Sequence, residues 1–87
     1  MNKREIVKMF RAIGNERRFA ILSNLLSTKE LNVGQISELI HLSFKSTSRH
    51  LAILADRGLV NHRQVNLNRL YSLSEDFPKE LRVFLKK

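Results

Sequence analysis

Residues 43–57 read Ser-Phe-Lys-Ser-Thr-Ser-Arg-His-Leu-Ala-Ile-Leu-Ala-Asp-Arg, and the fold is decided in this stretch. Ser43 is a good N-cap, because its hydroxyl can accept from a free backbone amide at a helix start. We therefore predict a helix from Phe44, which Gly58 ends in the left-handed conformation. Small and apolar side chains recur at helical spacing and should face the core. They are Thr47, Leu51, Leu54 and Ala55.

A short helix is predicted directly before this one. Asn32 and Gln35 have the spacing of a capping box, in which each side chain bonds the other residue's backbone amide. The apolar face of this helix is Ile36, Leu39 and Ile40. Residues 41–43 then form a tight turn, in which His41 is a turn residue with no further role. Two helices joined by a tight turn predict a helix-turn-helix.

Two more helices are predicted on the N-terminal side. The first ends at Gly14, and its stripe is Ile6, Val7, Phe10 and Ile13. Asn15 is the N-cap of the second. The stripe of that second helix should be core, and it comprises Ile21, Leu22, Leu25 and Leu26.

The period changes to two after Gly58, which predicts extended strands. A strand begins at Val60, residues 66–68 make a turn, and residues 69–73 return, so a β-hairpin is expected. A last helix follows Pro78, with one stripe formed by Phe77, Leu81, Phe84 and Leu85. The predicted fold is mainly α with a β-hairpin wing, a single winged helix-turn-helix domain over residues 1–87.

Length and charge limit the classes of function that the chain can have. The chain has 87 residues, enough for one small domain, and 16 Lys and Arg against 8 Asp and Glu give a net charge of +8. This charge predicts a polyanionic partner, with double-stranded DNA as the first candidate. Cysteine is absent, which excludes disulfides and thiolate metal sites. Charged residues interrupt the basic N-terminal stretch, so we expect no signal peptide, no membrane partner and a cytoplasmic location.

The helix from Phe44 carries the residues expected to contact DNA. A major groove about 12 Å wide admits one helix, and its first two turns reach the base edges. With Thr47 facing the core, Lys45 and Arg49 lie nearly opposite it. Ser46 and Ser48 lie on the flanks. Arg49 can bond both acceptors of a guanine, while the other three can take bases or phosphates.

Further contacts are predicted next to this face. His50 either binds a phosphate or covers the edge of the core. In the hairpin, His62, Arg63 and Arg69 form either an ordinary polar strand face or, as we predict, a wing that lies along phosphates. Tyr71 should pack in the core instead of stacking on a base.

At this point the sequence resembles the ArsR/SmtB winged-helix repressors, from about Ala12 to Leu73. The segments that carry the resemblance are 12–18 with Ile21-Leu22, 43–51 with Leu54, 58–60 and 70–73. The Ser-Arg-His-Leu portion, residues 48–51, is the most specific match. The resemblance implies a DNA-binding transcriptional regulator, most often a repressor.

The chain departs from the metal-sensing members of that family. Two cysteines of those members align with Asn32 and Gly34, and no histidine follows His62 to form the family's second site. We therefore expect no metal, no cofactor and no metal response through the thiolate site. An unknown effector, a protein partner or no switch at all remain open. Phe44 stands where the family usually has a polar residue, and it can contact a thymine methyl.

The first and last helices also need a partner for their apolar stripes. In the family these helices form a two-fold interface, so the resemblance implies a homodimer, for which an inverted-repeat operator is expected. The alternative is that these residues close the core of the single chain. The interface candidates are Ile6, Phe10, Leu81, Phe84 and Leu85.

The alternative function is the binding of a protein partner. Exposed Phe44 and Leu67 suit a winged-helix module that binds an acidic protein partner. An enzyme is not expected, because the sequence has no Gly-rich phosphate loop, no paired carboxylates and no nucleophile–base pair.

Overall fold

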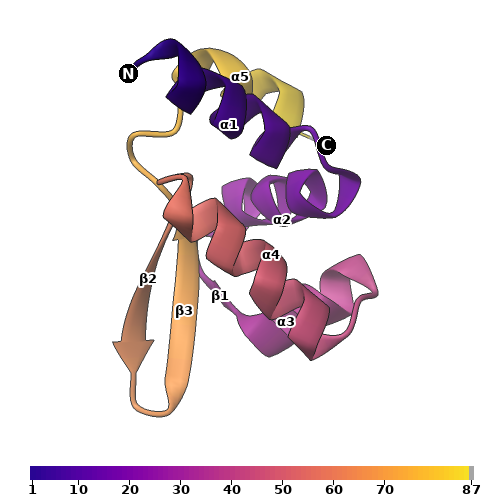
Figure 1. The fold of residues 1–87 in the computed structure, drawn as a ribbon. Helices are drawn as coiled ribbons and strands as arrows, with labels where there is room; N and C mark the ends of the chain where they lie inside the picture. Colours follow the sequence, from indigo (N-terminus) through magenta and orange to yellow (C-terminus); the bar gives the residue numbers. More distant parts are fainter. Residues whose placement is uncertain (87) are drawn as a thin grey trace.

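Five helices and a three-stranded antiparallel sheet make up residues 1–86, the part of the chain that the computed structural model describes. The tip of the β2–β3 hairpin points to one end of the molecule, and α1 and α5 lie toward the other (Figure 1). The predicted class, mainly α with a β-hairpin wing, is confirmed. The elements are α1 (Lys3–Ile13), α2 (Glu16–Ser27), β1 (Leu31–Asn32), α3 (Val33–Ile40), α4 (Phe44–Asp56), β2 (Val60–Val65), β3 (Asn68–Leu73) and α5 (Lys79–Leu85).

Local side chains start the helices at the predicted positions. The Asn15 side chain accepts from the amide three residues on at 3.1 Å. Ser43 Oγ accepts in the same way at 3.1 Å. Asn32 and Gln35 make both bonds of the capping box, at 2.8 and 2.9 Å. The three N-caps are confirmed, because each satisfies an amide that the helix itself cannot.

The helix-turn-helix depends on two left-handed residues. His41 ends α3 with φ 54° and ψ 51°, which reverses the chain within three residues and confirms its role in the turn. Gly58 follows α4 with φ +69°. The amide of Leu59 then donates to the carbonyl of Leu54 at 2.9 Å, the long bond of a Schellman motif. This turn leads α4 directly into β2.

Side chains of all five helices and of the sheet form the core within residues 1–86, with the largest share from α2, α3 and α4. From α2, Ile21, Leu22 and Leu25 are buried, as predicted, while Leu26 is half-buried. Thr47, Leu51 and Leu54 of α4 are fully buried, and Ala55 is half-buried. Each fully buried leucine or isoleucine stabilises the fold by about 1.5–3 kcal/mol, so these contacts hold α4 against α2 and α3.

Leu39 is a correction to the predicted face of α3. Its side chain is 50% exposed, whereas Ile36 and Ile40 are buried. The helix is only 8 residues long and packs on α2 along one narrow side, which leaves Leu39 outside the contact.

The sheet contains a strand that periodicity missed. The two residues of β1 pair with β3, Leu31 opposite Tyr71, and the strand order is β1-β3-β2. The hairpin turn is also tighter than expected, since Asn68 pairs with Val65 and belongs to β3. Of the predicted turn residues, Asn66 alone has positive φ, at 56°.

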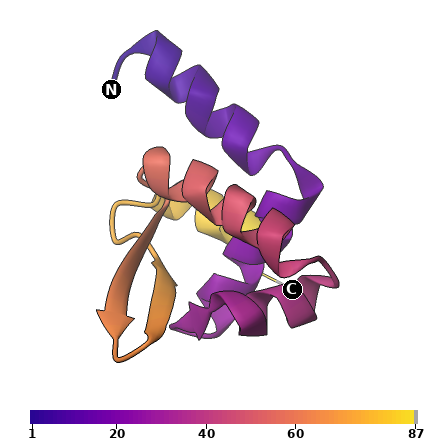
Figure 2. The ribbon, with the colours of Figure 1, turned by 60° about the horizontal axis from the view of Figure 1, so that its bottom comes forward.

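The two outer helices differ in how they pack. Figure 2 shows α1 reaching away from the rest of the molecule, with its C-terminal end near α2. Met9 and Ala12 are its buried residues. The predicted stripe of the last helix splits, because Leu85 is buried while Phe84 is 67% exposed. Adjacent residues of a helix point about 100° apart, so a narrow contact with the core can bury Leu85 and leave Phe84 in solvent.

Candidate nucleic-acid interface

The outer face of α4 carries the residues that the sequence predicts to contact DNA bases. Lys45 and Arg49 are exposed, and neither takes part in an ion pair within residues 1–86. Ser46 and Ser48 are half-buried beside them, while Thr47 on the opposite side is fully buried. The helix therefore presents two free cations toward solvent, with one hydroxyl on each flank. This arrangement can bond base edges or phosphates.

The start of α4 adds a second property to this face. Phe44, its first residue, is 61% exposed, and the N-terminal amides of a helix carry a partial positive charge. An anion such as a phosphate is favoured there. The apolar Phe44 ring lies next to this positive end, so the surface combines a charge for the backbone of DNA with an apolar group for a base.

The wing presents one free cation and one paired cation. Arg63 donates from Nε and Nη2 to the two carboxylate oxygens of Glu30, at 2.6 and 2.8 Å. This hydrogen bonding lowers the pKa of the Glu30 carboxyl and raises the pKa of Arg63. Arg69 is exposed and makes no ion pair within the described residues. Of the two predicted arginines, Arg69 has the guanidinium available for a phosphate.

His62 lies on the surface of the wing, where its ring packs against that of a core residue. It is exposed, and its ring centroid is 5.4 Å from that of Tyr71, its cross-strand neighbour. Tyr71 itself is 7% exposed. Its burial confirms that Tyr71 packs in the core instead of offering its ring to a base.

His50 does not share the free surface of Arg49. It is half-buried, and its Nδ1 lies 3.2 Å from Nη1 of Arg18 in α2. Burial of the ring, and then the charges of Arg18 and Arg17, lower the pKa of His50. The half-buried position agrees with the alternative in which His50 covers the edge of the core.

Arg17 and Arg18 were not singled out from the sequence. Arg17 donates to the carbonyl of Ile40 at 2.9 Å and so holds the C-terminal end of α3 against α2. Their only sequence signal was that both lie in residues 12–18, one of the segments that carried the family resemblance.

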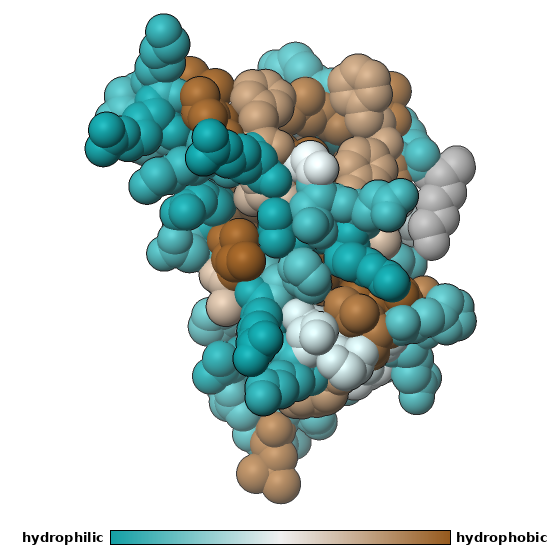
Figure 3. All heavy atoms as spheres, turned by 45° about the vertical axis from the view of Figure 1, so that its right-hand side comes forward, coloured by the Kyte–Doolittle hydropathy of each residue, from teal (hydrophilic) through white to brown (hydrophobic). Residues whose placement is uncertain are grey.

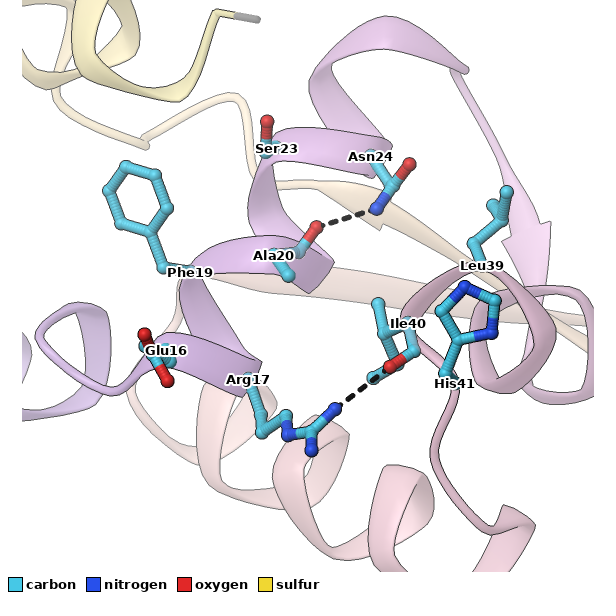
Figure 4. Close-up of a pocket in the computed structure, with 9 residues that line it drawn as sticks. All are labelled: Glu16, Arg17, Phe19, Ala20, Ser23, Asn24, Leu39, Ile40 and His41. Atoms are coloured by element: carbon cyan, nitrogen blue, oxygen red, sulfur yellow. Dashed lines mark hydrogen bonds between the residues drawn. The ribbon is translucent and has the colours of Figure 1, made fainter.

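Arg17 also lies at an open pocket of about 610 Å³ between α2 and α3. Figure 4 shows the Arg17 guanidinium pointing toward the Ile40 carbonyl, and the exposed Leu39 across from α2. Both hydrogen bonds drawn in Figure 4 connect residues of the fold to each other. The pocket is lined by Glu16, Arg17, Phe19, Ala20, Ser23, Asn24, Leu39, Ile40 and His41.

Exposed apolar side chains gather at the end of the molecule that α1 and α5 form (Figure 3). Of the predicted interface residues, Ile6, Phe10 and Phe84 are 38%, 52% and 67% exposed. Leu81 is half-buried against the core. Leu85 is a correction, since it is 1% exposed and the core of the single chain already covers it.

The positions of the family's thiolate site have other roles in this chain. Asn32 caps α3, and Gly34 lies within that helix. Residues 1–86 hold no group of three or more His, Cys, Asp or Glu side chains that could bind a metal ion. Over the same residues, every helix is too short or too polar to cross a membrane.

A helix-turn-helix with a free basic face, followed by a basic hairpin, is the architecture of winged-helix DNA-binding proteins. The model of the arsR family of bacterial regulatory proteins matches residues 15–62. The transcriptional activator HlyU of Vibrio cholerae is 42% identical over 73 residues, which cover 84% of this chain and 67% of that protein. The chain belongs to the arsR family of transcriptional regulators and is not an enzyme.

Other relatives agree with this assignment. The HTH-type regulator YceK of Bacillus subtilis is 33% identical over 70 residues, covering 79% of this chain and 70% of the relative. The structure of reduced HlyU from Vibrio cholerae has a TM-score of 0.80 at 38% identity, covering 97% of this chain and 84% of that one. The structure of NolR from Sinorhizobium fredii has a TM-score of 0.81 at 27% identity. The match covers 93% of this chain and 78% of that one. The chain spans about two thirds of the length of the curated relatives it matches.

Proposed function

We propose that this regulator is a homodimer that binds an inverted-repeat operator and represses transcription by occluding a promoter. The observation that carries the proposal is the pair of free cations, Lys45 and Arg49, on the outer face of α4 beside the basic wing. Repression by occlusion needs no surface beyond the one that binds DNA. This role places the protein with the chromosome in the cytoplasm.

Each DNA-contacting side chain has a proposed part. Arg49 bonds a guanine through both acceptors, and Lys45 with the flanking Ser46 and Ser48 takes bases or phosphates. Phe44 contacts a thymine methyl. Arg69 and His62 of the wing lie along phosphates and position the domain without reading sequence.

A second copy of the chain is the proposed occupant of the α1 and α5 surface. Ile6, Phe10 and Phe84 are large apolar side chains left in water by the single chain. Mb0332 of Mycobacterium bovis, a solved neighbour with a TM-score of 0.79 at 22% identity, is described as a homodimeric winged helix-turn-helix domain. Two-fold symmetry would set the recognition helices about 34 Å apart, one turn of DNA.

The proposed regulator does not respond to metal through thiolates. A homologue of the cadmium resistance regulator CadC from Staphylococcus aureus is 29% identical over 80 residues, covering 92% of this chain and 66% of that protein. The 87 residues of this chain contain no cysteine. Any effector would have to be a small molecule without thiolate coordination or a protein partner.

In vitro selection of DNA fragments by the purified protein tests the proposal. We expect enrichment of an inverted repeat with half-site centres about one helical turn apart. On the selected site, log K should fall linearly with log salt, by about 0.9 for each phosphate contacted. Selection of sequences without two-fold symmetry would rule out the proposed dimeric reader.

One observation supports a second candidate, a module that binds an acidic protein. Phe44 and Leu67 are 61% and 97% exposed, and both line a pocket of about 310 Å³ next to Arg69. If this candidate is correct, selection enriches no inverted repeat and one acidic protein is retained, and Phe44→Ser abolishes that retention.

A further inference from the structure

A single guanidinium joins three parts of the fold. Arg18, near the start of α2, donates from Nε to the carbonyl of Ala12 at 2.9 Å. Its Nη2 donates to the carbonyl of Arg11 at 3.4 Å. Its Nη1 lies 3.2 Å from Nδ1 of His50 in α4. One side chain of α2 therefore bonds the last turn of α1 and the recognition helix.

The chemistry of arginine suits this position. The last carbonyls of a helix have no partner within it, and they carry a partial negative charge that favours a cation. The flat guanidinium directs its N–H groups along fixed directions, so it can hold acceptors on two sides at once. A lysine has the same charge, but its ammonium is one compact donor at the end of a flexible chain and cannot span α1 and α4 in this way.

The contact with Arg18 also defines the state of the His50 ring. Arginine only donates, so Nδ1 must be the acceptor, and a neutral ring then carries its proton on Nε2. The charges that bear on the ring are those of Arg18 and Arg17, both from α2, and they act with burial to lower its pKa. From α1, this network contains the carbonyls of Ala12 and Arg11.

We propose that Arg18 and His50 are positioning residues that fix the angle between α1 and α4. The inference rests on the proposed function, in which α1 contacts the second copy and α4 reads DNA. His50 directly follows Arg49 in α4, so a shift of the His50 backbone moves the main reading side chain. In the dimer, the distance between the two recognition helices is then set through this link.

A direct role for His50 at a phosphate predicts the opposite pH dependence. A phosphate favours the protonated ring, so acidification would strengthen DNA binding. In the positioning role, protonation of Nδ1 removes the acceptor and places a cation beside Arg18. The pKa of His50 lies below 6.5, the ordinary value of histidine. DNA binding should then weaken as the pH falls through this lowered pKa.

The first test needs no DNA. Nitrogen-15 NMR of the histidine rings should show the His50 proton on Nε2 and an unprotonated, hydrogen-bonded Nδ1. Arg18→Lys keeps the positive charge but loses the flat guanidinium with its fixed N–H directions. In this variant the nitrogen-15 chemical shift of Nδ1 should become that of a nitrogen without a hydrogen bond. A wild-type ring with its proton on Nδ1 would overturn the proposed link, whatever the protein binds.

The second test measures operator affinity and salt dependence. His50→Leu and Arg18→Lys should each bind about tenfold more weakly, with the salt slope of the wild type. His50→Asn should stay within about twofold, because its amide oxygen can accept near the position of Nδ1. Circular dichroism establishes that each variant is folded before its affinity is compared.

The pH profile is recorded in a His62→Asn background, so that His50 is the histidine that remains next to the DNA-binding surface. Loss of affinity on acidification, absent in the additional His50→Asn variant, is the expected result. Unchanged affinity of His50→Leu, or a salt slope reduced by about one, would show that His50 does not position α4. Failure of the wild type to bind any operator would instead refute the proposed function, and the ring measurement would still decide the link.

Discussion

Arg63 in the wing donates two hydrogen bonds to Glu30, which lies 33 residues earlier, directly before β1. The pair ties β2 to the start of β1 across the sheet. It also neutralises one of the cations that the wing would otherwise present to DNA. Glu30 therefore limits the charge of the wing as well as holding its base.

Glu30→Gln should strengthen DNA binding. The substitution frees the Arg63 guanidinium for a phosphate, so affinity should rise a few-fold at low salt and the salt slope should steepen by about 0.9. Fluorescence anisotropy at several salt concentrations measures both quantities. Arg63→Ala is the matched control, and a marked loss of affinity in this variant would show that Arg63 leaves Glu30 to contact DNA.

The same pair predicts a small pH dependence of stability. The hydrogen bonds from Arg63 lower the pKa of the Glu30 carboxyl below its ordinary value of 4.5. The folded state therefore favours the charged carboxylate, and this contribution is present above pH 4.5 and lost as the pH falls through the lowered pKa. Thermal unfolding of the wild type and Glu30→Gln should differ near neutral pH and converge in acid. Because Arg63 is exposed and Glu30 is only half-buried, solvent screens the pair, so the difference should be slight and should shrink in high salt.

Arg49→Ala should reduce operator affinity and relax sequence preference. Loss of a bidentate guanine contact removes about 1–3 kcal/mol of discrimination against the wrong base. Arg69→Ala should instead weaken binding to all sequences alike and reduce the salt slope by about one. Lys79→Ala removes an exposed cation from α5, away from the tip of the hairpin (Figure 1). Affinity of Arg49→Ala equal to that of Lys79→Ala would contradict the assigned reading face.

Phe84→Glu should shift the protein from dimer to monomer. Phe84 is 67% exposed in the single chain, so a charge there does not disturb the core, but it is expensive to bury in an interface. Sedimentation equilibrium measures the change in mass. Leu67→Glu, at a residue 97% exposed on the wing, should remain dimeric. A Phe84→Glu dimer as stable as that of Leu67→Glu would exclude α5 from the interface.

Thr47→Val should stabilise the domain. Thr47 is fully buried, and its Oγ1 has no hydrogen-bond partner among residues 1–86. An unsatisfied buried hydroxyl costs about 1–3 kcal/mol, and valine of similar shape removes it. The melting temperature should rise by several degrees. Thr47→Ser keeps the hydroxyl and loses the methyl, so it should melt lower than the wild type, and equal melting of both variants would refute this account.

Helix starts were predictable because their causes are local. The caps at Asn15, Asn32 and Ser43 bond amides three residues away, so a short window of sequence contains both partners. The outer face of α4 was predictable for the same reason. Once Thr47 faces the core, the 3.6-residue period places Arg49 on the other side.

The errors arose where one element meets another. Leu39 and Leu85 each continue an apolar stripe, and periodicity cannot tell how wide a contact the neighbouring helix offers: Leu39 proved exposed and Leu85 buried. The β1 strand has two residues, too few to show a period, and exists because β3 lies beside it.

The sequence alone predicted where helices begin, the turn at His41 and which cations lie on exposed helix faces, because the responsible interactions act within one or two helical turns. The partners of those cations are set by the tertiary structure. Glu30 meets Arg63 at a separation of 33 residues, and Arg18 meets His50 at a separation of 32. Such pairs exist because the packed core holds distant segments side by side, and these pairs decide which arginines are free to bind DNA.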